Sequence, residues 1–116
     1  MLGRIRGFFR RVPPSVRFDD EAVVRTRGDG GTETIRWLDL EKVSIVTTDE
    51  GPWGEDVYWV LEGRGGGCAV PQGAAGCDLL FERLAQLPGF NSQAVIEAMG
   101  STDNAKFLCW ERKPTR

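Results

Sequence analysis

Hydrophobic and polar residues alternate through the first part of the chain. Residues 16 to 18 alternate in this way, and an apolar run covers residues 22 to 24. Glycine-rich residues 28 to 31 follow, and Ile35 and Trp37 then share one side of a segment whose other side is polar. A period of two is typical of half-buried strands, and a glycine-rich break is typical of a hairpin turn. This part of the chain is therefore predicted to form strands joined by a hairpin.

The same alternation returns in two longer segments. Residues 43 to 48 are rich in β-branched side chains, which favour a strand over a helix. Residues 57 to 62 place valine, tryptophan and leucine on one face, and the glycine tract of residues 63 to 67 leads into the short apolar run of residues 68 to 70. We expect a second hairpin, with the glycines in its turn.

The period changes in the part of the chain that follows. Apolar residues recur there at intervals of three and four positions, which predicts a helix with one buried stripe, ended by Pro88 and Gly89. The expected stripe consists of Cys77, Leu80, Phe81, Leu84 and Leu87.

A shorter second helix is predicted next. Asn91 or Ser92 is placed to cap its start, and Gly100 lies just past its end. Its apolar residues are Val95, Ile96 and Met99. The apolar residues 107 to 110 then predict a last strand or a docking segment.

The order of these elements predicts an α+β fold. About six antiparallel strands come first, and one long and one short helix follow, which differs from the regular alternation of a parallel α/β fold. The length of 116 residues suits a single core. We expect one domain over residues 15 to 111, after a basic arm of residues 1 to 14 and before a polar tail of residues 112 to 116.

Residues 35 to 45, Ile-Arg-Trp-Leu-Asp-Leu-Glu-Lys-Val-Ser-Ile, resemble the strand, turn and strand of pleckstrin-homology-like (PH-like) domains. Residues 47 to 52, 56 to 59, 87 to 90 and 98 to 102 resemble segments of a family of small uncharacterised bacterial proteins. The resemblance implies a curled, PH-like sandwich of strands. The second predicted helix departs from the PH-like pattern, in which a single C-terminal helix closes the barrel, and no lipid-binding residues are implied.

Charge is distributed unevenly along the chain. The net charge is −2, but residues 1 to 17 hold five arginines and no acidic residue, and residues 18 to 116 hold ten basic and seventeen acidic residues. An acidic body repels phosphates, so nucleic acid is not expected as its partner.

The basic arm also carries apolar side chains at helical spacing. It is interpreted as a solvated tail, as a segment that lies on an anionic membrane, or as a segment that docks in a groove of another protein. The arm residues proposed for such contacts are Arg4, Arg6, Phe8, Phe9, Arg10 and Arg11.

Several kinds of chemistry are excluded by residue type. The chain has no histidine, which removes Ser-His-Asp and Cys-His catalysis and histidine-ligated zinc. Its three cysteines, Cys68, Cys77 and Cys109, have no C-x-x-C spacing and are expected to be reduced core thiols. The glycine tract lacks the Lys-Ser/Thr that follows a phosphate loop. We expect no catalytic residue, no cofactor and no metal.

One acidic loop is a candidate contact surface. It is interpreted as a solvated turn, or as a loop that docks on a partner through its tryptophan. Calcium binding is a third interpretation, although the spacing differs from that of an EF-hand loop. The candidate residues are Asp49, Glu50, Trp53, Glu55 and Asp56.

These patterns favour a non-catalytic module for protein interaction or regulation, located in the cytoplasm, with another protein as its partner. One alternative is a peripheral membrane protein that docks on anionic lipid through the arm. A second alternative is a small hydrolase or ligand-binding enzyme, which requires a pocket with perturbed carboxylates.

Overall fold

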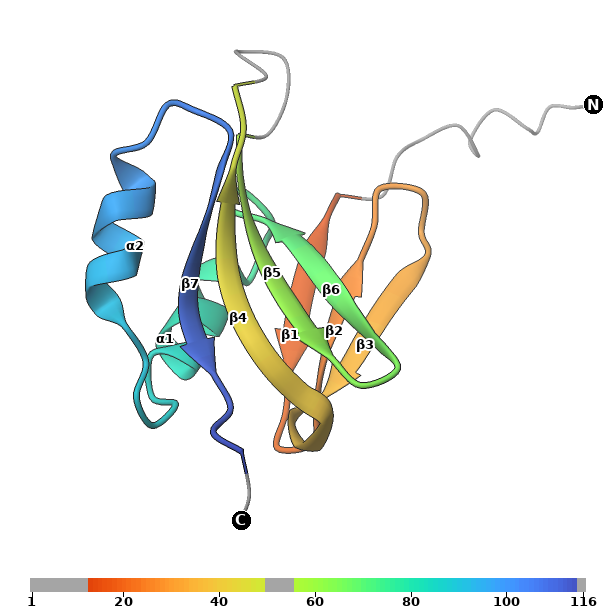
Figure 1. Ribbon diagram of the computed structural model, residues 1–116. Helices are drawn as coiled ribbons and strands as arrows, with labels where there is room; N and C mark the ends of the chain where they lie inside the picture. The colour runs from red at the N-terminus through yellow and green to blue at the C-terminus, as the bar shows by residue number, and fades with distance from the viewer. Residues whose placement is uncertain (1–12, 50–55, 115–116) are drawn as a thin grey trace, which may run out of the picture.

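The computed structural model describes residues 13 to 49 and 56 to 114. These residues form an α+β fold with two antiparallel sheets and two helices (Figure 1). The predicted fold class is therefore confirmed, with seven strands where about six were expected.

The first sheet has the strand order β1-β2-β3. Its strands are β1 (Ser15–Phe18), β2 (Ala22–Thr26) and β3 (Thr32–Arg36). Their buried side chains, Val16, Val23 and Ile35, point to one side, as the alternation predicted. Trp37 lies just outside β3, in a short 3₁₀ helix, where its indole Nε1 donates to the carbonyl of Asp19 over 2.7 Å.

The second sheet has the order β6-β5-β4-β7. Its strands are β4 (Leu40–Thr47), β5 (Val57–Gly63), β6 (Gly66–Pro71) and β7 (Ala105–Glu111). The apolar segment near the end of the chain is thus a strand, and it pairs with β4. Gly65 has φ +78° and turns β5 into β6, so the glycine tract forms a hairpin turn as expected.

Both helices have eight residues: α1 is Cys77–Leu84 and α2 is Ser92–Met99. The first helix is shorter than predicted, because its last turn tightens. The backbone N–H of Leu87 donates to the carbonyl of Leu84, three residues earlier, over 3.0 Å. Asn91 caps α2 by accepting from the N–H of Ala94 over 3.2 Å.

The core lies between the inner faces of the two sheets and α1. Figure 1 shows α2 beside β7 at one edge of the second sheet and the β1-β2-β3 sheet at the other end. Within the part of the chain that the structure describes, no helix is long and apolar enough to cross a bilayer.

Candidate functional site

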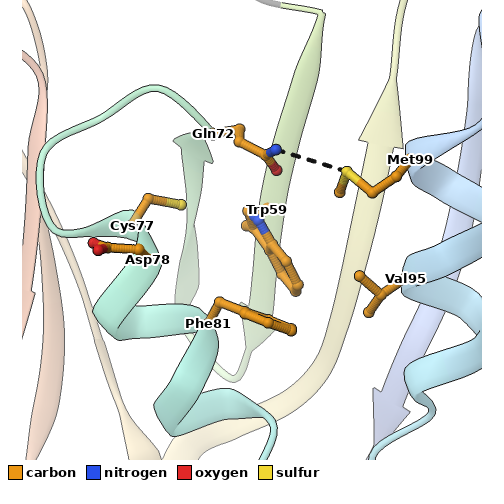
Figure 2. A pocket seen from close by; sticks show the side chains of 7 residues that line it. All are labelled: Trp59, Gln72, Cys77, Asp78, Phe81, Val95 and Met99. Atoms are coloured by element: carbon orange, nitrogen blue, oxygen red, sulfur yellow. Dashed lines mark hydrogen bonds between the residues drawn. The ribbon is translucent and has the colours of Figure 1, made fainter.

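The α1–α2 groove is an open apolar hollow between the two helices, with a volume of about 290 Å³. Its floor is strand β5, one wall is α1 and the other wall is α2 (Figure 2). The lining residues are Trp59, Gln72, Cys77, Asp78, Phe81, Val95 and Met99.

Trp59 forms the floor of the α1–α2 groove. It pairs in register with Ile45 of β4 and Val70 of β6, so its side chain points to the inner face of the sheet. Only 3% of its surface is exposed. Its ring centroid lies 5.4 Å from that of Phe81, and Phe81 in turn makes an edge contact with Phe90 at 6.4 Å. This aromatic row fixes the floor.

Phe81 was expected on the buried stripe of the first helix, and this expectation is wrong. Cys77, Leu80 and Leu84 are buried, but 37% of Phe81 is exposed. The Phe81 side chain lies at the margin of the stripe, on the side where α2 stands apart from α1 (Figure 2). The spacing of the apolar residues identifies the buried stripe, but it does not show which residue at the edge of the stripe stays exposed.

The second helix buries its small residues and not the larger apolar residues named from its sequence. Its buried residues are Ala94 and Ala98, and it packs on β7 and β4. The larger apolar residues lie outside this contact: 64% of Ile96 and 44% of Met99 are exposed. Small side chains at positions four apart let the helix approach the sheet closely. Val95 and Met99 line the groove, whereas Ile96 is exposed outside it.

Two polar side chains, Gln72 and Asp78, line the α1–α2 groove. The amide of Gln72, in the turn after β6, donates to the sulfur of Met99 over 3.6 Å and so links the turn to α2 (Figure 2). Asp78 lines the groove on α1, and Glu82 is exposed four residues later on the same helix. Asp78 is therefore the one carboxylate that lines the groove, and Glu82 lies on α1 outside the lining.

Burial changes the acidity of two of the three thiols. Burial, with a smaller effect of the nearby Glu33 charge, raises the pKa of Cys68 from 9.0 to about 11. Burial raises the pKa of Cys109 to about 11 as well. Cys77 is buried on α1. Cys68 and Cys109 are therefore protonated at neutral pH and poor nucleophiles, as expected for core cysteines.

The acidic loop falls mostly outside the described residues, since Glu50, Trp53 and Glu55 all belong to that segment. Asp49 and Asp56 are described, and both are exposed. The backbone of Asp56 accepts from Thr48 N–H over 2.9 Å, and Asp49 N–H donates to the side chain of Asn104 over 3.0 Å. Neither Asp49 nor Asp56 is among the residues that line the α1–α2 groove.

The basic arm also lies mostly outside the described residues. These undescribed positions include Arg4, Arg6, Phe8, Phe9, Arg10 and Arg11. The described end of the arm is Pro13 and Pro14, and the carbonyl of Pro14 accepts from Ala75 N–H over 3.1 Å.

Among residues 13 to 49 and 56 to 114, no group of three or more carboxylates and thiols could hold a metal ion. Comparisons with protein-family models, with curated proteins and with solved structures found no match. The resemblance to PH-like domains and to small bacterial proteins therefore stays a prediction.

Sequence reasoning did not find the α1–α2 groove. A weak signal exists in α2, where Ala94 and Ala98 form one stripe and Val95 and Met99 form the next. A helix with two adjacent apolar stripes, one small and one bulky, has more apolar surface than one packing contact buries.

Proposed function

We propose that this chain is a non-catalytic protein-interaction module whose contact surface is the α1–α2 groove. The observation that carries the proposal is a gathering of exposed bulky apolar side chains around a buried aromatic floor. Phe81 is 37% exposed and Met99 44%, beside Trp59 at 3%. An apolar patch of this kind with a charged margin is typical of protein-binding surfaces.

The size of the groove supports a side-chain anchor. Small-molecule and cofactor sites enclose most of the ligand. The α1–α2 groove has about 290 Å³ and is open along one side. One or two bulky apolar side chains of a peptide fit such a hollow, as in the binding of amphipathic helices.

The chemistry of the groove argues against a hydrolase. Its seven lining residues include one carboxylate, Asp78, and one thiol, Cys77, which is buried. General acid and base catalysis by carboxylates needs two such groups in contrasting environments. The proposal therefore assigns Asp78 to recognition of a charged partner.

The free thiols support a cytoplasmic location within this proposal. Cys68 and Cys109 are free thiols, which is ordinary for a reducing compartment. A partner protein in the same compartment is the expected ligand, and the acidic loop from Asp49 to Asp56 remains a second candidate contact.

The proposal is tested with a library of random peptides displayed against the purified chain. We expect selected peptides to carry a bulky apolar anchor and to lose binding about tenfold or more when Met99→Glu places a charge on the groove wall. Leu108→Glu is the matched control, because Leu108 is 45% exposed on the opposite face of the second sheet. Peptides that bind both variants equally well would refute the α1–α2 groove as the contact surface.

A further inference from the structure

We propose that residues 1 to 12 of this chain are the intramolecular ligand of the α1–α2 groove. The inference rests on the proposed function only in that the groove accepts an apolar peptide segment. It makes the groove a regulated surface, which an outside partner reaches by displacing the chain's own N-terminal residues.

The attachment point of residues 1 to 12 lies beside the groove. Pro14 accepts from Ala75 N–H over 3.1 Å, and Val16 N–H donates to the Ala75 carbonyl over 2.9 Å. Ala75 stands in the turn between Gln72 and Cys77, which both line the groove. The segment therefore starts from a turn whose two flanking residues, Gln72 and Cys77, line the groove.

The length of the segment is sufficient. Twelve residues span about 18 Å as a helix and about 40 Å when extended. The groove runs between two helices of eight residues each, or about 12 Å in length. Residues 1 to 12 can thus cover the groove in either form.

The composition of the segment complements that of the groove. Residues 1 to 12 contain four arginines, no acidic residue and bulky apolar side chains that include Phe8 and Phe9. The groove offers the apolar surfaces of Phe81 and Met99 and the carboxylate of Asp78, and the exposed Glu82 lies one turn further along α1. Arginine and aromatic side chains are enriched at protein interfaces, and arginine pairs well with carboxylates there.

The outer face of the second sheet is a poorer match. It exposes Leu108, but its charges are already paired across the strands. Lys106 lies 3.5 Å from Glu62, and Lys42 lies 3.9 Å from Glu111. The lysines of this face repel arginines, and its carboxylates are engaged, so residues 1 to 12 are assigned to the α1–α2 groove.

Residues 1 to 12 are covalently joined to the domain, so weak contacts are sufficient to hold them in the groove. A short linker gives an effective concentration in the millimolar range, so an intrinsic dissociation constant near 1 mM, about 4 kcal/mol, already fills half of the grooves. Two apolar anchors and one or two exposed charge pairs supply an affinity of this order.

The test compares full-length chains by nuclear magnetic resonance. In the variant Phe8→Ser with Phe9→Ser, we expect shifts at the Trp59 indole and at the methyl groups of Val95 and Met99. The signals of the outer face, such as the Leu108 methyl groups, should stay unchanged. Unchanged groove signals, or changes confined to Leu108, would overturn the proposal.

Charge reversal gives an independent measurement. Arg10→Glu with Arg11→Glu should produce the same groove shifts, and adding Asp78→Arg with Glu82→Arg should restore the wild-type signals. Asp78→Asn with Glu82→Gln is a milder pair that keeps the helix if the reversal weakens it. If neither double substitution at Asp78 and Glu82 changes the effect of Arg10→Glu with Arg11→Glu, charge pairing with α1 is excluded.

The membrane alternative gives a distinct outcome. If residues 1 to 12 occupy the groove, Asp78→Arg with Glu82→Arg should release them and raise binding to phosphatidylserine vesicles at low salt at least about twofold. Equal, strong vesicle binding by the wild type and this variant would show that lipid, rather than the groove, holds the segment. That result would leave peptide selection on the groove unchanged. The intramolecular ligand can therefore be refuted while the proposed function still holds.

Discussion

The side-chain carboxylate of Glu33 on β3 accepts a hydrogen bond from the backbone N–H of Ala69 on β6, over 3.2 Å. The two strands belong to different sheets, so this bond joins the sheets where their edges meet. The other oxygen of Glu33 lies 3.2 Å from Arg25 and 3.6 Å from Arg27. One carboxylate thus satisfies an N–H on the free edge of β6 and pairs with two arginines.

The first prediction concerns Glu33. Glu33→Ala should lower the free energy of unfolding by about 1–3 kcal/mol, because it leaves the Ala69 N–H and the half-buried Arg25 without their acceptor. Glu33→Gln keeps an acceptor for Ala69 and should cost less. Urea denaturation measures both. Glu111→Ala is the control, since its pair with Lys42 is exposed and should contribute less than about 1 kcal/mol; equal losses in Glu33→Ala and this control would contradict the role of Glu33.

The second prediction contrasts two hydroxyls buried on β4. Among the described residues, no partner lies within hydrogen-bond distance of Ser44 Oγ, whereas Thr47 Oγ1 donates to the carbonyl of Asp103 over 2.6 Å. Ser44→Ala should therefore leave the stability unchanged or raise it by up to about 1 kcal/mol, and Thr47→Val should lower it by about 1–2 kcal/mol. Thermal unfolding of the two variants checks the contrast, and a larger loss in Ser44→Ala would reverse it.

The third prediction concerns the start of α1. Gly76 has φ +90°, and a Cβ atom there would lie 2.2 Å from the carbonyl oxygen of Val16. Both the backbone strain and the collision oppose a side chain. Gly76→Ala should lower the free energy of unfolding by roughly 2 kcal/mol or more.

Gly100 provides the matched control for this substitution. Its φ is −92°, and the nearest atom to an added Cβ lies 3.8 Å away. Gly100→Ala should change the stability by less than about 1 kcal/mol. Chemical denaturation of both variants under the same conditions would contradict this account if the two losses were equal.

The fourth prediction is a loss of stability at alkaline pH. The pKa values of Cys68 and Cys109 rise in the folded chain from 9.0 to about 11, chiefly because of burial. Unfolded thiols ionise first, so their contribution to stability is complete below pH 9 and is lost as the pH rises from 9 to 11. The loss should reach roughly 2 kcal/mol for each thiol.

The measurement compares urea midpoints between about pH 8 and 11 for the wild type and for Cys68→Ala with Cys109→Ala. The double variant should be less stable at neutral pH, because it loses buried volume, but its midpoint should fall less steeply with pH. Parallel slopes of the two proteins would show that the thiols do not account for the loss.

The sequence was sufficient to predict the strands and most of the core. Alternation places Val43, Ile45 and Trp59 on one face without any knowledge of their partners, because the period of a strand is local. The buried stripe of α1 was predicted for the same reason, apart from Phe81 at its margin.

The α1–α2 groove could not be predicted in this way. Whether Val95 or Ala94 faces the core depends on how closely α2 approaches β7, and this distance is set by contacts between segments far apart in the chain. Periodicity assigns an apolar face to a helix, but the choice between two apolar faces is made by packing.

The pairing of β7 with β4 has a consequence for folding. Thr47 pairs with Ala105, and β5, β6, α1 and α2 all lie between them in the chain. One side of β4 therefore has no strand to pair with until those segments have been synthesised. A truncation after Gly100 would expose this apolar edge permanently, and chaperone binding or aggregation of the shortened chain is the expected result.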